Sequence, residues 1–326
     1  MTRLRKRALV ALLGTAALAF IGVQTTASAA TVTVSTSAQL TSALAAATPG
    51  TVISLAAGTT FTGNFKATKS GTSSSRITLT GPRSAVLKAT GGRGLELDAS
   101  YWTISGFTIT GGQKGLMALG SNHTVVDGLK VTGVGHEGIH FQYTSSDNVV
   151  RNSEITNTGL EYAGYGEGIY FGSANSNWPG GTPDKSDRNK ALNNKIGPDV
   201  RAESIDIKEG TTGGELTGNT FDGTGQSGEH FADSWVDMKG NGYLVSNNKG
   251  SKVFVHDATY GAFELHQQLD GWGLNNTFSG NTADVQSPYA YGFYVAKTGL
   301  GTKICGNNTV TNAGKGFANV APASGC

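Results

Sequence analysis

The stretch ESIDIK at residues 203–208 carries a pattern that recurs along this chain and decides its fold. A variable first residue is followed by a small one, and then two apolar residues alternate with two variable ones. Nine segments share this pattern, with Trp235 as the one bulky exception, and they begin at Arg93, Lys114, Glu137, Glu167, Glu203, Ser234, Gly261, Tyr291 and Lys315. These starting positions are 21, 23, 30, 36, 31, 27, 30 and 24 residues apart, and repeats of this size predict a solenoid of stacked coils. The middle coils are the longest, so we expect insertions there.

The composition favours an all-β solenoid with many turns. The chain has 48 glycines and only 15% charged residues, which favours short strands over helices. Residues Ser37 to Thr48 are an exception, because Leu40, Leu44 and Ala45 have helical spacing and Pro49 follows. We expect this short helix to cap the open end of a parallel β-helix, which forms one domain over residues 30–326.

The first 29 residues have the features of a secretory signal peptide. Four basic residues within positions 3–7 precede an apolar run over residues 8–23 and small residues suited to cleavage near Ala30. The run is short for a membrane anchor, so we expect a secreted, soluble protein. Loss of the four basic residues changes the net charge from +2 to −2. An acidic polymer would therefore have to meet a local basic patch.

Other features limit the partners and the covalent links of the chain. No basic stripe, zinc-finger spacing or recognition-helix pattern indicates a nucleic-acid partner, and we expect a monomer. Cys305 and Cys326 are the only cysteines, and export predicts a disulfide between them over the last coil. Asparagines recur at comparable places in successive coils and are expected to form a structural ladder: Asn152, Asn193, Asn194, Asn219, Asn247, Asn248, Asn281, Asn307 and Asn308.

The two variable positions of each segment are expected to point outward and to stack on those of the neighbouring coils, about 4.8 Å away. The first outward column reads Glu96, Met117, His140, Tyr170, Asp206, Asp237, Glu264 and Tyr294. The second reads Asp98, Leu119, Gln142, Gly172, Lys208, Lys239, His266 and Ala296. The columns predict a basic row of Lys208, Lys239 and His266 beside an acidic row of Asp206, Asp237 and Glu264. Such ordered charge favours a functional site, although stacked polar ladders also occur in structural β-helices.

This arrangement fits β-elimination of a uronic-acid polymer. A basic row can neutralise the C6 carboxylate, while Tyr170 and His140 are able to move protons between C5, O4 and the protein. Two lysines about 5 Å apart repel each other by roughly 3 kcal/mol at an effective dielectric constant of about 20, which lowers their pKa. Asp206 and Asp237 act in the opposite direction, so the sequence leaves the charge of the lysines open.

Three other interpretations remain open at this stage. A glycoside hydrolase on the same fold would use Asp206, Asp237 and Glu264 as its carboxyl groups. A calcium site would use Glu137, Glu167 and Glu203 together with Asp206 or Asp237, because calcium prefers oxygen ligands. Elimination itself requires no cofactor in the lysine-based interpretation. A non-catalytic carbohydrate-binding protein is the third alternative.

The largest insertion lies between Gly172 and Asn189. Long loops beside a rigid scaffold commonly carry binding residues. Trp178 in this loop is a candidate for stacking on a sugar ring, and aromatic residues that share this potential are Tyr143, Tyr162, Tyr165 and Trp272. Ordinary loop packing is the alternative for each of them.

Three segments carry a family resemblance: PGTVISLAAGTTF at residues 49–61, GEGIYFGS at 166–173 and AESIDIKEGTTGG at 202–214. With the coil repeats they resemble the right-handed parallel β-helix polysaccharide lyases, and most of all polysaccharide lyase family 31, which acts on alginate or glucuronan. The architecture of the whole mature chain is similar, whereas only the central segments are specific. The calcium–aspartate clusters of pectate lyases and the NTD and GHG motifs of polygalacturonases are not evident, which disfavours a pectate lyase or a hydrolase.

The resemblance implies that Tyr170 and Lys208 form the catalytic pair. Lys208 is assigned to C5-proton abstraction or carboxylate neutralisation and Tyr170 to proton transfer at O4. Substrate binding is assigned to Lys239 and His266 for the carboxylate, and to Glu264 and Trp178. His140, Asp206 and Asp237 are expected to orient the substrate and to tune pKa values.

Overall fold

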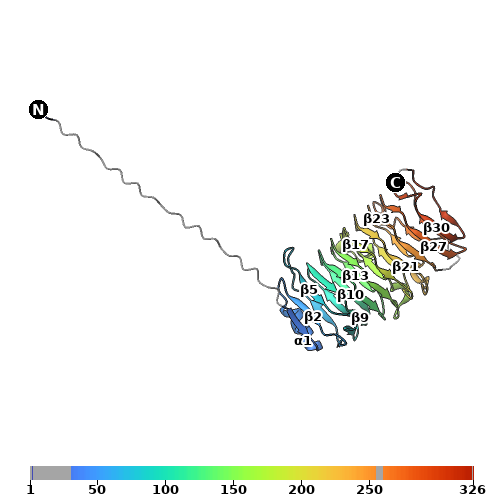
Figure 1. Ribbon diagram of the computed structural model, residues 1–326. Coiled ribbons are helices and arrows are strands. Elements are labelled where there is room, and N and C mark those ends of the chain that lie inside the picture. Colours follow the sequence, from blue (N-terminus) through green and yellow to red (C-terminus); the bar gives the residue numbers. More distant parts are fainter. Residues whose placement is uncertain (1, 3–30, 255–259, 325) are drawn as a thin grey trace.

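The computed structural model describes residue 2 and residues 31–254, 260–324 and 326. Over these residues the chain forms a right-handed parallel β-helix, in which each coil contributes one strand to each of three sheets (Figure 1). The predicted fold class is confirmed. The predicted signal peptide lies outside the described residues, apart from residue 2. Among the described residues, we find no helix that is long and apolar enough to cross a membrane.

Three sheets run the length of the solenoid. Sheet 1 contains, in spatial order, β1 (Thr31–Val34), β2 (Val52–Leu55), β5 (Ile77–Thr80), β8 (Trp102–Ser105), β11 (Val125–Asp127), β14 (Val149–Arg151), β17 (Lys190–Leu192), β20 (Glu215–Thr217), β23 (Leu244–Ser246), β26 (Thr277–Ser279) and β29 (Lys303–Ile304). Sheet 2 contains β3 (Thr60–Thr62), β6 (Val86–Ala89), β9 (Thr108–Gly111), β12 (Lys130–Thr132), β15 (Glu154–Thr156), β18 (Lys195–Ile196), β21 (Thr220–Asp222), β24 (Lys249–Ser251), β27 (Thr282–Ser287) and β30 (Thr309–Ala313).

Sheet 3 is built from the nine repeated segments and one further strand. Its strands are β4 (Phe65–Ala67), β7 (Arg93–Leu97), β10 (Lys114–Leu119), β13 (Ile139–Gln142), β16 (Ile169–Phe171), β19 (Ile205–Ile207), β22 (Val236–Met238), β25 (Gly261–Leu265), β28 (Tyr291–Val295) and β31 (Gly316–Ala318). The sequence pattern did not identify β4, because Asn64 occupies the position at which the pattern requires a small residue. β4 nevertheless pairs in parallel with β7.

The core consists of apolar rows inside the solenoid. In sheet 3, Ile139, Ile169, Ile205 and Val236 pair in register on neighbouring strands, and all four are fully buried. Burial of each such side chain stabilises the fold by about 1.5–3 kcal/mol relative to exposure. Because every coil repeats these contacts with its neighbours, the outward side chains stand on a rigid support.

One α-helix, α1 (Ser37–Ala46), packs at the N-terminal end of the described solenoid. Thr36 caps the helix by accepting a hydrogen bond from the backbone N–H of Gln39, whose side chain bonds back to the cap. Leu40 and Leu44 are buried, which confirms the predicted cap, whereas Ala45 is exposed. Helical periodicity explains the difference, because the position seven residues after Leu40 is Ala47, which is buried.

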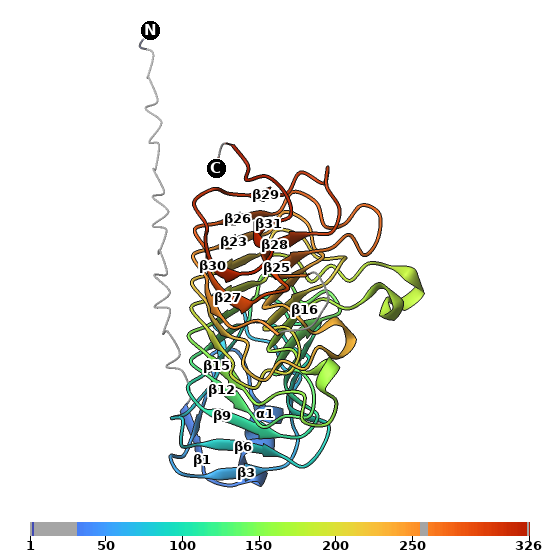
Figure 2. The same cartoon turned by 90° about the vertical axis from the view of Figure 1, so that its right-hand side faces the viewer.

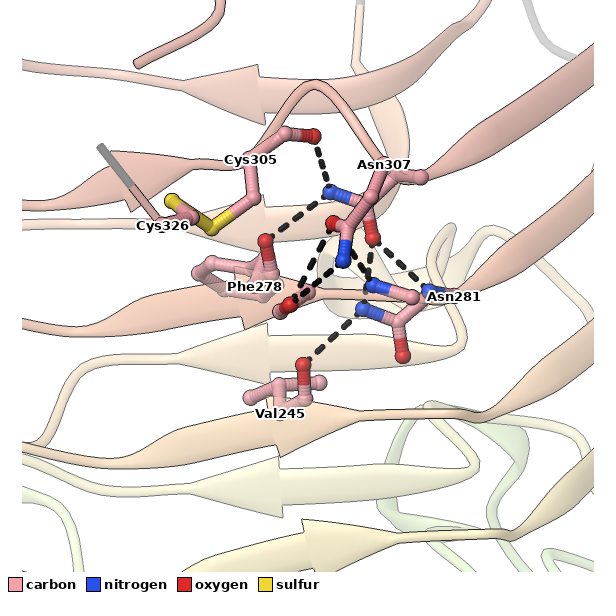
Figure 3. The surroundings of a disulfide bond; sticks show 9 residues. Val245, Phe278, Asn281, Cys305, Asn307 and Cys326 are labelled. Atoms are coloured by element: carbon pink, nitrogen blue, oxygen red, sulfur yellow. Dashed lines mark hydrogen bonds between the residues drawn. A yellow bond between two sulfur atoms is a disulfide. The ribbon is translucent and has the colours of Figure 1, made fainter. Parts of the chain in front are cut away.

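Part of the predicted asparagine set forms a ladder at the corner between sheets 1 and 2, whereas Asn152, Asn193, Asn247 and Asn307 are exposed and lie outside it. The ladder contains five buried asparagines, and the side-chain Nδ2 of each donates to the side-chain Oδ1 of the next along the stack: Asn194, Asn219, Asn248, Asn281 and Asn308. Figure 3 shows its C-terminal end, where Asn281 Nδ2 also donates to the carbonyl of Val245 at 2.9 Å. The disulfide between Cys305 and Cys326, which confirms the predicted pairing, lies beside it.

The corners before and after sheet 3 carry the insertions. Before it lie two short 3-10 helices, η1 (Ala163–Tyr165) and η4 (Glu229–Phe231), which contact each other. After it lies the long loop with η2 (Asn175–Asn177) and η3 (Pro179–Gly181), which projects from the body of the solenoid in Figure 2. Insertions thus flank the strands that carry Tyr170, Asp206 and Asp237.

The ladder predicts a large stability cost for Asn248→Ala. The side chain of Asn248 accepts from Asn219 and donates to the carbonyl of Leu216 and to Asn281, so its removal leaves several buried polar groups without partners. We expect a loss of about 3 kcal/mol in the free energy of unfolding, measured by denaturant titration. The neighbouring Asn247 is exposed and left-handed (φ 54°), so Asn247→Gly is the control and should change stability little. Equal effects of the two variants would contradict the ladder's role.

Candidate active site

The strand register brings the first outward column together as predicted. His140, Tyr170, Asp206, Asp237 and Glu264 are direct partners on the successive strands β13, β16, β19, β22 and β25. The parallel pairing of identical pattern positions is the cause, because it stacks equivalent side chains at the spacing of neighbouring strands.

The second column does not form a separate basic row, which corrects the sequence-based expectation. Lys208 Nζ lies 2.6 Å from Asp206 Oδ2, and Lys239 Nζ lies 3.2 Å from Asp206 Oδ1. Lys239 also pairs closely with Asp237, whose other oxygen lies 2.9 Å from His266 Nδ1. The long basic side chains bend toward the carboxylates because buried charges need partners. Acids and bases therefore form one interleaved network.

The outward residues are also more covered than alternation alone implies. Asp206, Lys239 and Glu264 are buried, Tyr170 is only 8% exposed, and the side chain of Lys208 is 15% exposed. Side chains packed at the strand spacing cover one another. Because these charged groups are largely buried, electrostatic interactions act strongly among them.

Tyr170 and Lys208 lie next to each other, with the ammonium nitrogen 5.1 Å from the centre of the phenol ring. Burial, and then the charge of Asp206, raise the pKa of Tyr170 well above its ordinary value. Burial disfavours the charge of Lys208, but Asp206 and Asp237 raise its pKa above the ordinary value. Both residues therefore hold their protons at neutral pH.

The surroundings of Lys239 decide the direction of its pKa shift, which the sequence left open. Burial and the neighbouring Lys208 both lower the pKa of Lys239, yet Asp206 and Asp237 outweigh them and the net shift is upward. Burial opposes ionisation of Asp237 as well, but Lys239 and His266 hold its pKa below the ordinary range. Lys239 and Asp237 therefore form a pair of opposite charges.

His140 is fixed in front of Tyr170. Its ring is T-shaped against the phenol ring, with the centroids 4.2 Å apart. Nε2 lies 2.8 Å from the carbonyl oxygen of Gly172, which can only accept, and Nδ1 lies 3.1 Å from Glu137 Oε1. These contacts fix the orientation of the His140 ring, and its role toward the substrate stays a prediction. A carboxylate and a carbonyl engage its two ring nitrogens.

Glu137 is drawn away from the other acids by basic partners. Burial disfavours its charge, but His140 and Lys114 lower the pKa of Glu137 to about 2. Lys114 forms an ion pair with Glu137 that sequence reasoning missed, because Lys114 occupies the first position of its segment, whose side-chain direction alternation does not define. Glu137 therefore acts as a permanent carboxylate that holds His140.

Glu167, Glu203 and Asp206 come together instead, and we call them the acid trio. Their carboxylate oxygens lie within 4.8 Å of one another, and Glu167 Oε2 has no hydrogen-bond partner among the described residues. Burial, and then the charges of Glu137 and Asp206, raise the pKa of Glu167 to about 8. The pKa of Glu203 is raised well above its ordinary value, by burial and then by Asp206. Of the predicted calcium ligands, Glu167, Glu203 and Asp206 therefore converge, whereas Glu137 does not.

Two further predicted binding residues are mostly covered. Glu264 is buried and accepts a hydrogen bond of 2.8 Å from the backbone N–H of Gly261, and burial together with Asp233 raises its pKa. Trp178 is 8% exposed, its Nε1 donates to the carbonyl of Ser173 at 2.9 Å, and its ring lies 6.5 Å from that of Trp272. Glu264 is thus bonded within its own strand β25 and Trp178 within the long loop, and a direct contact of either with substrate remains a prediction.

Comparisons with known proteins agree with this geometry. A family model described as "Right handed beta helix region" matches residues 59–179 and 93–260. The crystal structure of an alginate lyase from Paenibacillus sp. strain FPU-7 is 40% identical, with a TM-score of 0.81, over 90% of this chain and 99% of that one. A search of curated proteins found no match.

Two more distant structures share the fold alone. Pectate lyase Pel9A is 16% identical, with a TM-score of 0.63, over 87% of this chain and 72% of that one. The Streptococcus pneumoniae surface protein and adhesin PfbA is 14% identical, with a TM-score of 0.56, over 85% and 82% of the two chains.

The acid trio predicts a pH-dependent loss of stability that Glu167→Gln should reduce. The carboxyl of Glu167 ionises near 4.5 ordinarily and near 8 in the folded protein, so the folded state binds the proton more tightly. The resulting stabilisation is complete below pH 4.5 and disappears as the pH rises to 8. Glutamine imitates the protonated form, so the variant should have a higher Tm than the wild type at pH 8.5 and a smaller decrease in Tm from pH 5.

The control is Glu154→Gln on β15. Glu154 is paired with Lys130 at 2.9 Å, which lowers its pKa, so this variant should gain nothing at alkaline pH. An unchanged pH profile for Glu167→Gln would show that its carboxyl is already ionised in the folded state.

Proposed function

Because this chain belongs to the right-handed parallel β-helix polysaccharide lyases, we propose that it cleaves a 1,4-linked polyuronate, alginate or glucuronan, by β-elimination. The observation that carries the proposal is that Tyr170 on β16 lies next to Lys208, which directly follows the paired strand β19, within a buried network that contains a second lysine. The 40% identity to an alginate lyase over nearly the whole of both chains supports the same substrate class.

The reaction requires the protein to fill three chemical roles. A positive group must stabilise the C6 carboxylate as C5 loses its proton, a base must take that proton, and an acid must protonate O4 as the C4–O4 bond breaks and the C4–C5 double bond forms. We assign Lys239 and His266 to binding of the C6 carboxylate, with Lys239 supplying positive charge. Tyr170 and Lys208 supply the acid and the base.

The protonation of the pair limits how it works. The resting site has the protonated forms of both Tyr170 and Lys208. One acid and one base are required, so the active form of the pair carries one proton fewer than the resting form. We assign proton donation to O4 to the phenol of Tyr170, whose ring lies between His140 and Lys208.

No cofactor is required in this proposal, because lysines supply the positive charge that calcium supplies in other sites. The acid trio is the place where a calcium ion would bind, since oxygen ligands suit it and Glu167 Oε2 lacks a partner among the described residues. We expect activity to survive chelation with EDTA.

We also propose that the protein acts outside the cell as a monomer. The predicted signal peptide precedes the described solenoid, and the disulfide between Cys305 and Cys326 suits an oxidising compartment. The disulfide also holds Cys326 beside β29.

The test of function is a product assay with polymannuronate, polyguluronate, glucuronan and polygalacturonate. Elimination gives unsaturated uronates that absorb in the ultraviolet, hydrolysis gives saturated products heavier by one water, and a binding protein releases no oligosaccharide. A hydrolase is disfavoured by the site, because lysines engage both Asp206 and Asp237. Saturated products, or none with any of the four polymers, would overturn the proposal.

The catalytic pair predicts severe losses for two variants. Tyr170→Phe keeps the ring but removes the hydroxyl, so kcat should fall at least about a hundredfold with little change in polymer affinity. Lys208→Ala should abolish elimination, while Lys249→Ala, at an exposed lysine of β24, should retain it. Circular dichroism checks that each variant folds. A kcat of Tyr170→Phe within a few-fold of wild type would remove Tyr170 from the reaction.

The protonated pair also predicts an activity that rises with pH. The pKa values of both Tyr170 and Lys208 are raised, so the singly deprotonated active form is scarce at neutral pH and increases as the pH increases. Initial rates of ultraviolet absorbance at saturating polymer should therefore grow from pH 6 to pH 9, as long as the protein stays folded. A rate that decreases over this range would mean that the base already lacks its proton at neutral pH.

A further inference from the structure

Tyr143 lines a cavity that the proposed reaction does not use. The cavity has a volume of about 300 Å³, and it lies between the turn after β13 and the long loop that carries η3. Its lining residues are Tyr143, Thr144, Pro179, Thr182, Pro183 and Asp184. Tyr143 is 44% exposed, so its ring forms an accessible apolar wall opposite two prolines.

The backbone at this turn is strained because residues other than glycine occupy left-handed positions. Tyr143 and the β-branched Thr144 both adopt left-handed conformations, with φ of 56° and 63°. The register pairs Leu119 with Gln142, so Gly120 (φ 58°) is the equivalent of Tyr143 in the preceding coil. A glycine occupies the left-handed position there without strain, in a turn that is one residue shorter. The presence of tyrosine therefore needs an explanation outside the turn.

Asp184 holds this strained turn in place. It is buried, and its Oδ2 accepts from the backbone N–H of Tyr143 at 2.9 Å and its Oδ1 from that of Thr144 at 2.8 Å. The hydroxyls of Ser173 and Ser186 donate to the same two oxygens, at 2.8 and 2.7 Å. Four donors thus satisfy the carboxylate, so it offers the cavity a compensated charge rather than a free one.

The cavity opens beside the proposed active site. Tyr143 follows β13, whose His140 pairs directly with Tyr170 of β16. Three residues along an extended chain span about 10 Å, so Tyr143 lies about that far from His140, just past the end of β13. A polymer that crosses Tyr170 and Lys208 would meet this wall with another of its sugar rings.

From these observations we infer that Tyr143, with Pro179 and Pro183, forms a subsite that stacks on the C–H face of a uronate ring away from the cleaved bond. Aromatic rings bind such faces because they offer apolar area with a polar edge. The volume suits a single small ring, being near the lower end of the roughly 300–1,000 Å³ of ligand pockets. Asp184 is the positioning residue of the subsite. This inference rests on the proposed function for the nature of its ligand.

The test compares Tyr143→Ala with Tyr143→Phe. Stacking requires the ring and not the hydroxyl, so Tyr143→Ala should raise KM for polymannuronate about three- to ten-fold without change in kcat, while Tyr143→Phe should behave like the wild type. For a trisaccharide substrate that gives an unsaturated product, Tyr143→Ala should change KM less than it does for the polymer. Tyr289→Ala is the matched control, because Tyr289 is 46% exposed on the turn before β28, five coils away.

Asp184→Asn tests the positioning role. An amide cannot accept from both backbone N–H groups, so the variant should raise KM like Tyr143→Ala, and the double variant should be no worse than either single one. Additive effects would show that Asp184 serves the fold and not the subsite.

Affinity electrophoresis through alginate and glucuronan gels keeps this inference separate from the proposed function. It measures polymer binding without catalysis, and Tyr143→Ala should migrate with about three- to ten-fold weaker retention than the wild type. Unchanged retention together with unchanged KM would overturn the subsite, even if the wild type is a lyase. Weaker retention without unsaturated products from the wild type would uphold the subsite and overturn the lyase reaction.

Discussion

Parallel strand pairing in constant register is the constraint on which the rest of this structure depends. It places equivalent residues of successive coils next to each other, at about 4.8 Å, from one end of the solenoid to the other. Inside the solenoid this spacing gives the apolar rows, and at one corner it gives the asparagine ladder. On the outer face of sheet 3 the same spacing brings Tyr170, Asp206 and Asp237 together. The candidate site is thus a local use of the rule that builds the fold.

Close stacking also controls the electrostatics of the site. Carboxylates stacked at this distance would repel one another strongly, and two features of the structure reduce this repulsion. Lys208 and Lys239 turn back onto Asp206, and burial together with the neighbouring acids raises the pKa values of Glu167 and Glu203. Buried ion pairs of this kind cost desolvation energy and contribute little net stability. Their arrangement is better explained by the charged groups that elimination of a uronate requires.

The corners supply what the regular sheets cannot. A strand offers only an outward position at every second residue, whereas the loops before and after sheet 3 can rise above its surface. The loop with η2 and η3 buries Trp178 and brings Asp184 to the turn of Tyr143. A rigid solenoid tolerates such insertions because each coil is already held by its two neighbours. The loops can therefore vary without change to the strands that carry Tyr170, Asp206 and Asp237.

The sequence by itself determined the β-helix, the capping helix, the disulfide, the asparagine ladder and the order of residues along the first outward column. These features follow from local periodicity and spacing, which a single chain displays directly. Only the tertiary structure decided how the charges pair, because Lys208, Lys239 and His266 bend along directions that strand alternation does not describe. It also separated Glu137 from the acid trio, through the unforeseen contact with Lys114, and it revealed the cavity beside Tyr143. Alternation assigns a side chain to a face, but the partner of a long or buried side chain depends on what neighbouring coils and loops place within its reach.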